Sequence, residues 1–214
     1  MIAYKHFVWD FDGMLFDSYP HTARAAVNTL RDFGRDANEK DMYDDLRVSI
    51  GYARNKYAFT PEMMERFYQY EHDLTMEPVT MPYPGIPALL ARIKNEGGKN
   101  YLLTNRDEYA GIYLRKYGMY ESFEEIVDTT AGFPSKPDPS GMLYLAEKHC
   151  FDGDALMLGD REVDITAGIG GGADGLFFDE FRRVETTKAR YIVHTLRELE
   201  ELLFGVTPDK EENT

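Results

Sequence analysis

Apolar residues follow two patterns along the chain, and the pattern changes near residue 82. Residues 4–9 form an apolar and aromatic run with the length of a buried strand. From there to residue 82, apolar positions recur every three or four residues, which is typical of helices. Beyond residue 82, short apolar runs alternate with helical periods, punctuated by Pro and Gly. The sequence therefore predicts one strand, a helical block and then an α/β region.

The block over 15–82 is expected to be all helix and no strand. Helices are predicted there over 19–33, over 39–47 and from 61 onward. Gly34 is a stop signal for the first helix, and Thr60 with Pro61 forms a cap and first turn for the last.

The region after residue 82 alternates strands and helices. Strands are predicted over 101–103, 125–127, 155–158, 175–178 and 191–193, and helices over 86–95, 108–117, 140–149, 164–169 and 196–204. Such alternation implies a mostly parallel sheet with helices on both faces. We therefore expect an α/β fold with a three-layer, Rossmann-like core.

The domain boundaries follow from these patterns. The core should comprise 1–14 and 83–206, with 15–82 as a small all-helical domain inserted after the first strand, and 207–214 as a polar, frayed tail. Because ligands of parallel sheets bind beyond the carboxyl ends of the strands, and the insert leaves from that edge, it is placed to act as a lid.

Composition narrows the class of protein. The 214 residues include 24 Lys and Arg against 38 Asp and Glu, giving a formal net charge of −14, which argues against nucleic-acid binding. No apolar run has membrane-spanning length, no secretory signal is recognisable, and the single Cys150 fits a reducing compartment. We expect a soluble, cytoplasmic protein that contacts neither membrane nor nucleic acid, with a monomer as the default.

Candidate chemistry begins where the first strand ends, at Asp10 and Asp12. Alternate residues of a strand share a side, and Gly13 lets the backbone turn away beyond them. Two carboxylates at such a short distance repel each other unless a cation or a shared proton lies between them. Mg²⁺ is a cation that prefers oxygen ligands. An ordinary polar turn explains this stretch equally well.

Three further motifs change that balance. In chain order the four are Asp10-Phe11-Asp12-Gly13, Thr104-Asn105, Lys136-Pro137-Asp138-Pro139 and Gly159-Asp160-Arg161-Glu162-Val163-Asp164. This order resembles the haloacid dehalogenase-like (HAD) superfamily of phosphohydrolases, and the helical insert resembles the cap of its phosphoglycolate phosphatase and β-phosphoglucomutase branch. Met14 departs from the pattern, because many relatives carry Thr there.

The resemblance implies catalytic roles for four residues. Asp10 would be the nucleophile that forms an aspartyl phosphate, and Asp12 the acid and then the base. Thr104 and Lys136 would bind the phosphoryl group, with Asn105 helping to place the substrate. Taken alone, Thr104-Asn105 is more typical of a helix cap, and Lys136 of a solvated surface residue.

The resemblance also implies a Mg²⁺ cofactor. Asp10, the Asp12 backbone carbonyl and Asp160 would be the ligands, and Asp164 would support the metal or Lys136. Capping of the following helix is an alternative role for Asp160 and Asp164.

The function expected is Mg²⁺-dependent hydrolysis of a small phosphorylated metabolite, similar to phosphoglycolate phosphatase. A sugar-phosphate mutase of the β-phosphoglucomutase type and a non-catalytic phospho-ligand-binding regulator are the alternatives. A dehalogenase is disfavoured, because that branch lacks the second acid, here Asp12. Neither the substrate nor the cap residues that would select it can be named from the sequence.

Overall fold

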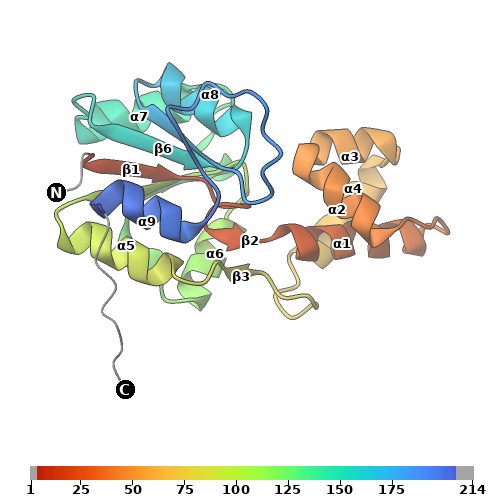
Figure 1. Cartoon of the computed structure of the whole chain (residues 1–214). Helices are drawn as coiled ribbons and strands as arrows, with labels where there is room; N and C mark the ends of the chain where they lie inside the picture. The colour runs from red at the N-terminus through yellow and green to blue at the C-terminus, as the bar shows by residue number, and fades with distance from the viewer. Residues whose placement is uncertain (1–3, 206–214) are drawn as a thin grey trace. The chain divides into compact units, whose positions relative to one another are not determined.

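The computed structural model describes residues 4–205 (Figure 1). Its strands are β1 (His6–Trp9), β2 (Phe16–Asp17), β3 (Met81–Pro82), β4 (Lys99–Leu103), β5 (Phe123–Val127), β6 (Ala155–Gly159), β7 (Asp174–Phe178) and β8 (Tyr191–Val193). Its helices are α1 (Tyr19–Asp32), α2 (Glu39–Val48), α3 (Ile50–Lys56), α4 (Pro61–Glu71), α5 (Ile86–Asn95), α6 (Tyr109–Lys116), α7 (Ser140–His149), α8 (Glu162–Gly170) and α9 (Leu196–Phe204), with 3₁₀ turns η1 (Tyr120–Ser122) and η2 (Thr129–Ala131). The tail predicted over 207–214 lies outside the described residues.

The chain divides into two compact units. Of the described residues, 4–15 and 83–205 form the core unit, and Phe16–Pro82 form the helical unit. The role of the helical unit as a lid stays a prediction.

The core unit is built on a sheet of six strands within the described residues, in the order β5-β4-β1-β6-β7-β8. All of its strand pairs are parallel. The chain passes from β1 to β4 and β5 on one side, then crosses to β6, β7 and β8 on the other. The strand order therefore reverses at β1, which is where ligands bind in such sheets.

Helices cover both faces of this sheet. Figure 1 shows α7 and α8 on one side and α5 and α9 on the other. On the first side, Val8, Tyr101 and Met157 of the sheet pack with Met142 and Leu145 of α7. All four residues of β1 are buried, as expected for a strand covered on two faces. The predicted three-layer α/β core with a mostly parallel sheet is confirmed.

The helical unit is not purely helical, so the prediction of no strand over 15–82 is wrong in this detail. Phe16 pairs antiparallel with Pro82, and Asp17 with Met81. The strands are two residues long because they only join the chain where it enters and leaves the unit. Such short pieces carry no periodic signal in the sequence.

The sequence also missed α3. The helix has seven residues and contains Gly51, so it offers neither a long apolar period nor high helix propensity. Its N-cap residue is Ser49, whose hydroxyl accepts a hydrogen bond from the Tyr52 amide. The predicted cap at Thr60 is confirmed by the bond that its hydroxyl accepts from the Met63 amide.

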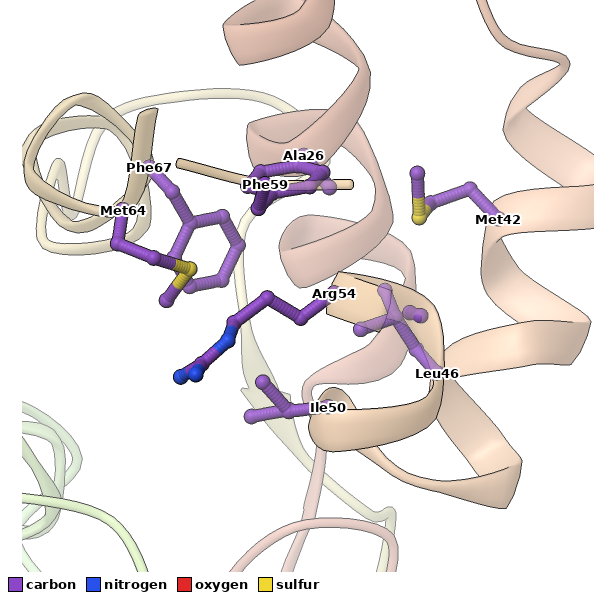
Figure 2. Close-up of a pocket in the computed structure, with 9 residues that line it drawn as sticks. Ala26, Met42, Leu46, Ile50, Arg54, Phe59, Met64 and Phe67 are labelled. Carbon is purple, nitrogen blue, oxygen red and sulfur yellow. The ribbon is translucent and has the colours of Figure 1, made fainter. Parts of the chain in front are cut away.

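The helical unit has its own apolar core and an apolar pocket. Figure 2 shows the pocket, which is lined by Ala26, Met42, Leu46, Ile50, Ala53, Arg54, Phe59, Met64 and Phe67. Nearby cations contact groups within the unit: Lys56 pairs with Asp45 at 2.7 Å, and Arg47 lies 4.9 Å from the centre of the Tyr19 ring. None of the described helices, in either unit, is long and apolar enough to cross a membrane.

Candidate active site

The parallel register brings the predicted motifs to one edge of the sheet. Trp9 pairs with Leu102 on one side and with Leu158 on the other. The residues that follow these partners therefore leave the sheet at the same edge, which places Asp10, Thr104 and Asp160 together. All three side chains are buried.

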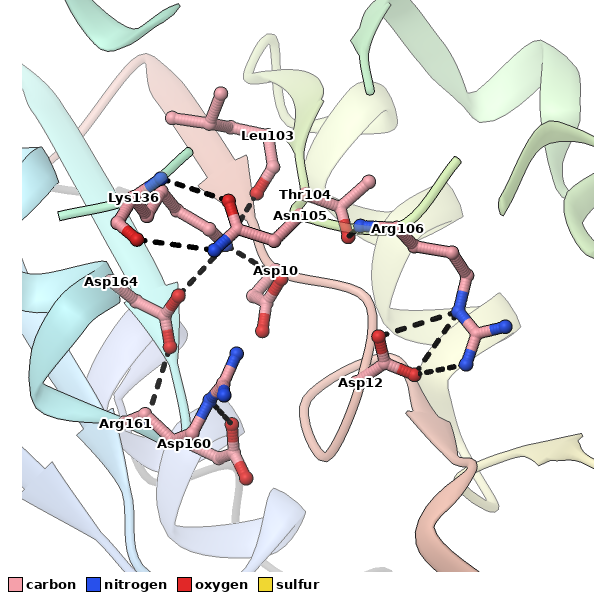
Figure 3. Close-up of polar contacts among 10 residues, drawn as sticks. All are labelled: Asp10, Asp12, Leu103, Thr104, Asn105, Arg106, Lys136, Asp160, Arg161 and Asp164. Carbon is pink, nitrogen blue, oxygen red and sulfur yellow. Dashed lines mark hydrogen bonds and ion pairs between the residues drawn. The ribbon is translucent and has the colours of Figure 1, made fainter. Parts of the chain in front are cut away.

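Lys136 is the centre of a buried group of charges (Figure 3). Its ammonium lies 2.6 Å from Asp10 Oδ1 and 2.7 Å from Asp164 Oδ1, and it donates a hydrogen bond of 2.7 Å to the Leu103 carbonyl. The three charged side chains are at most 2% exposed. The interpretation of Lys136 as a solvated surface residue is therefore wrong.

Asn105 holds the backbone of Lys136. Its Oδ1 accepts a hydrogen bond from the Lys136 amide at 2.8 Å, and its Nδ2 donates to the Lys136 carbonyl at 3.2 Å. Thr104 Oγ1 accepts from the Arg106 amide. The cap residue of α6 is Glu108, so Thr104 and Asn105 do not cap that helix. Asn105 instead fixes the turn that carries the lysine.

Asp164 has both roles that the sequence left open. Its Oδ1 lies against Lys136, while its Oδ2 accepts a hydrogen bond from the Arg161 amide and so caps the start of α8. Gly159 makes this placement possible, because a Cβ at that position would overlap the Asp164 side chain. The lack of a side chain at Gly159, at the end of β6, therefore lets the Asp164 carboxylate lie close to the strand.

Burial and neighbouring charges shift the ionisation of this group. Burial, and then the Asp164 carboxylate, raises the pKa of Asp10 to about 6, although Lys136 and Arg161 act in the opposite direction. Burial alone would lower the pKa of Lys136, but Asp10 and Asp164 raise it above its usual value. Lys136 is therefore held charged, while an ionised Asp10 needs further positive charge beside it.

The donor set fits a hard divalent cation. Oxygens of Asp10, Asp160 and Asp164 lie within 4.8 Å of one another. Asp10 Oδ2 is buried, and no hydrogen-bond partner reaches it among the described residues. Buried carboxylate oxygens in excess of nearby cations are the ligands that Mg²⁺ prefers.

Asp12 points away from this group and forms an ion pair that the sequence did not predict. Figure 3 shows its carboxylate turned toward Arg106, whose Nη2 donates to Asp12 Oδ1 at 2.7 Å, with Nε at 3.2 Å from the same oxygen. The Asp12 side chain is 22% exposed and that of Arg106 is 8% exposed. The sequence offered one sign of this pair. A basic residue, Arg106, directly follows Thr104-Asn105 near the end of a predicted strand, at the edge where the candidate acids are expected.

Two further residues of the first motif, Gly13 and Met14, form the turn that follows Asp12. Gly13 has φ +75°, as the turn beyond Asp12 requires, and the neighbouring Met14 side chain is fully buried.

A polar pocket beside Lys136 is lined by Thr104 and Asn105, together with residues of the 127–138 segment. Three predicted site residues, Thr104, Asn105 and Lys136, therefore line a cavity.

Comparison with known proteins supplies the family. The model of the haloacid dehalogenase-like hydrolase family matches residues 7–176. A phosphoglycolate phosphatase from Aquifex aeolicus is 30% identical over 171 residues, covering 75% of this chain and 78% of the relative. One from Psychrobacter arcticus is 26% identical over 188 residues, covering 79% and 80%.

A solved structure gives the same result for the fold. The crystal structure of a hydrolase from Streptococcus pneumoniae superimposes with a TM-score of 0.67 and 29% identity. The match covers 94% of this chain and 99% of the other.

Proposed function

This chain belongs to the haloacid dehalogenase-like hydrolase family and is a phosphatase of that family, and we propose that it hydrolyses a small phosphorylated metabolite through a phosphoryl group carried on Asp10. The buried contact of Asp10 and Asp164 with Lys136, beside Asp160, is the observation that carries this proposal. Phosphoryl transfer needs positioning and charge neutralisation more than elaborate covalent chemistry, and this group offers both.

The proposed reaction has two steps. In the first, a carboxylate oxygen of Asp10 attacks phosphorus, the ester P–O bond breaks, and the leaving oxygen takes a proton from the Asp12 carboxyl group. In the second, Asp12 takes a proton from water, the water oxygen attacks phosphorus, and the Asp10–phosphorus bond breaks to release phosphate. One water molecule is consumed, and both carboxyl groups return to their starting states.

Lys136, Asn105 and Asp164 would serve the first step. The ammonium of Lys136 lies against Asp10, where it can offset charge on the nucleophile and on the phosphoryl oxygens. Asn105 and Asp164 hold that lysine from its backbone and from its side chain. Thr104, at the end of β4, would donate its hydroxyl proton to a phosphoryl oxygen.

Mg²⁺ is the cofactor proposed. Asp10 Oδ2 and the Asp160 carboxylate are the side-chain groups that would hold it, with the Asp12 backbone carbonyl. Both oxygens of Asp164 already have partners in Lys136 and Arg161, so its contribution would be mainly indirect. A bound Mg²⁺ supplies positive charge for the buried carboxylates and the phosphoryl oxygens.

The test is phosphate release from an aryl phosphate and from phosphoglycolate, with and without Mg²⁺. We expect Mg²⁺-dependent release by the wild type, and a loss of about 10⁴-fold or more in Asp10→Asn. Asp174→Asn is the matched control, because Asp174 is a carboxylate at the opposite edge of the same sheet. It should retain activity.

The outcomes separate the alternatives. Acid-quenched wild-type protein should carry phosphate on the peptide that contains Asp10, and Asp10→Asn should carry none. Absence of phosphate release from folded, Mg²⁺-loaded wild type across a panel of esters would overturn the phosphatase proposal. Conversion of one sugar phosphate into another, without release, would establish the mutase instead.

The remaining expectations stay predictions. A monomeric state can be checked by sedimentation, and a cytoplasmic location by fractionation. The choice of phosphoglycolate as first substrate rests on the relatives in which that activity is named.

A further inference from the structure

We propose that Arg106 is a positioning residue that fixes the Asp12 carboxyl group for proton transfer to the leaving oxygen. This inference rests on the proposed function, in which Asp12 is the acid of the first step. It assigns a role to a residue outside the four motifs.

The geometry of the pair is specific. Nε of Arg106 lies 3.2 and 3.3 Å from the two Asp12 oxygens, and Nη2 lies 2.7 Å from Oδ1. A guanidinium that approaches with two nitrogens fixes the plane of a carboxylate as well as its position. Of the two acids of the first motif, Asp12 is therefore oriented by Arg106, and Asp10 by Lys136.

Arg106 is itself fixed by its surroundings. Its guanidinium carbon lies 5.1 Å from the centre of the Phe11 ring and 5.9 Å from that of Tyr113. Its amide donates a hydrogen bond to Thr104 Oγ1 at 3.1 Å. The arginine thus connects the turn after β4, where the phosphoryl group is expected to bind, to the turn after β1, which carries the acid.

This arrangement is better suited to orientation than to stability. The Asp12 side chain remains 22% exposed, so water can hydrate it when the arginine is removed. Ion pairs that retain such access usually contribute little to folding. A general acid, by contrast, must lie within hydrogen-bonding reach of the leaving oxygen, and its efficiency falls when its position is lost.

The experiment measures kcat/KM for Arg106→Gln, Asp12→Asn and the double variant on two esters. An alkyl phosphate has a poor leaving group that needs the proton, whereas p-nitrophenyl phosphate has a good one that needs it far less. We expect Arg106→Gln to lose about 10-fold or more on the alkyl ester and no more than about threefold on the aryl ester. Arg106→Lys, which keeps the charge but not the planar fork, should fall between Arg106→Gln and wild type.

The double variant provides the stricter test. If Arg106 acts only through Asp12, adding Arg106→Gln to Asp12→Asn should change kcat/KM on the alkyl ester by less than about threefold. Arg115→Gln is the matched control, because Arg115 also lies against a tyrosine ring, at 3.8 Å from the centre of Tyr120, but contacts none of the motif residues in the described contacts. Its kcat/KM should equal that of wild type on both esters, and thermal unfolding should verify that all variants fold.

Three results would overturn the role of Arg106 while leaving the phosphatase intact. The first is a double variant whose loss of kcat/KM on the alkyl ester equals the product of the two single losses. The second is an equal loss of kcat/KM on both esters in Arg106→Gln. The third is wild-type activity of Arg106→Gln on the alkyl ester. A wild type that releases phosphate from neither ester would instead overturn the proposed function, and this inference with it.

Discussion

The two edges of the six-stranded sheet carry the same kinds of charged side chain in opposite surroundings. At the amino edge, Lys5 lies 2.7 Å from Asp154 and Arg190 lies 2.6 Å from Asp174, but the two basic side chains are 73% and 61% exposed. At the carboxyl edge, Lys136 makes contacts of similar length and is 2% exposed. Contact distance alone therefore does not distinguish a surface pair from a candidate active site.

Because of the difference in burial, pH has opposite effects on the stability that the carboxylates of the two edges contribute. The hydrogen bond from Lys5 holds the pKa of Asp154 below its usual value, so this pair contributes stability above the unfolded pKa and loses it in acid. Burial instead raises the pKa of Asp10 to about 6. Ionised Asp10 therefore costs stability as pH rises, which agrees with the catalytic role proposed for it.

The largest loss of stability is expected from Lys136→Gln. This change leaves Asp10 and Asp164 buried beside each other without their common cation, which should cost about 3 kcal/mol in the free energy of unfolding without metal. It should also lower kcat by about 100-fold or more, because the charge beside the proposed nucleophile, Asp10, is lost. Chemical denaturation in EDTA and steady-state kinetics in Mg²⁺ measure the two effects, and a variant as stable as wild type would contradict the first.

The pKa of Asp10 can be tested through the stability of Asp10→Asn in EDTA. Between the unfolded pKa near 3.8 and the folded value of about 6, the unfolded chain has released this proton while the folded chain keeps it. Wild-type stability should therefore fall as pH rises through that window. The variant has no titrating group at position 10, so its stability should not fall for this reason. Above pH 7 the variant should be more stable by on the order of 3 kcal/mol.

Two controls make this result specific. The difference between Asp10→Asn and wild type should vanish below about pH 3, where Asp10 is protonated in both states. Saturating Mg²⁺ should remove or reverse it above pH 7, because the ion stabilises only the wild-type carboxylate. Equal stability at every pH would show that the Asp10 pKa is not raised.

A smaller effect is expected from Gly159→Ala. The added Cβ would overlap Asp164, so α8 or the carboxylate must move, at a cost of about 1–3 kcal/mol. We expect kcat to fall by about 10-fold, because Lys136 loses part of its support. Ala155→Gly, at the other end of β6, is the comparison, and it should affect the thermal midpoint but leave kcat unchanged.

The smallest effect should come from Lys5→Gln at the amino edge. Because the lysine is exposed, its pair with Asp154 is screened by water and salt. We expect kcat to stay at the wild-type value, and the thermal midpoint to change less than in any variant of the carboxyl edge. A loss of activity would show that the two edges are coupled, contrary to this comparison.

The sequence by itself determined the order and type of most elements. Boundaries of α5, α7, α9 and β8 agree with the prediction. The three helices each have a full apolar period and a cap, Gly or Pro at one end or both. It also located the acids, since Asp10 and Asp160 directly follow apolar strands and the register of a parallel sheet then brings them together. Short elements such as α3 and β2 were missed, because they have too few residues to show a period.

Only the tertiary structure decided which partner each charge has. Asp10 and Lys136 are 126 residues apart, and Arg106 and Asp12 are 94 apart. Asn105 holds Lys136 across 31 residues. Local patterns contain no information about such pairs, since they depend on how turns from different strands meet at one edge and on how much water that edge excludes. The candidate chemistry and the support of Lys136 by Asp164 were therefore visible in the motifs, whereas the contacts of Asn105 with Lys136 and of Arg106 with Asp12 required the fold.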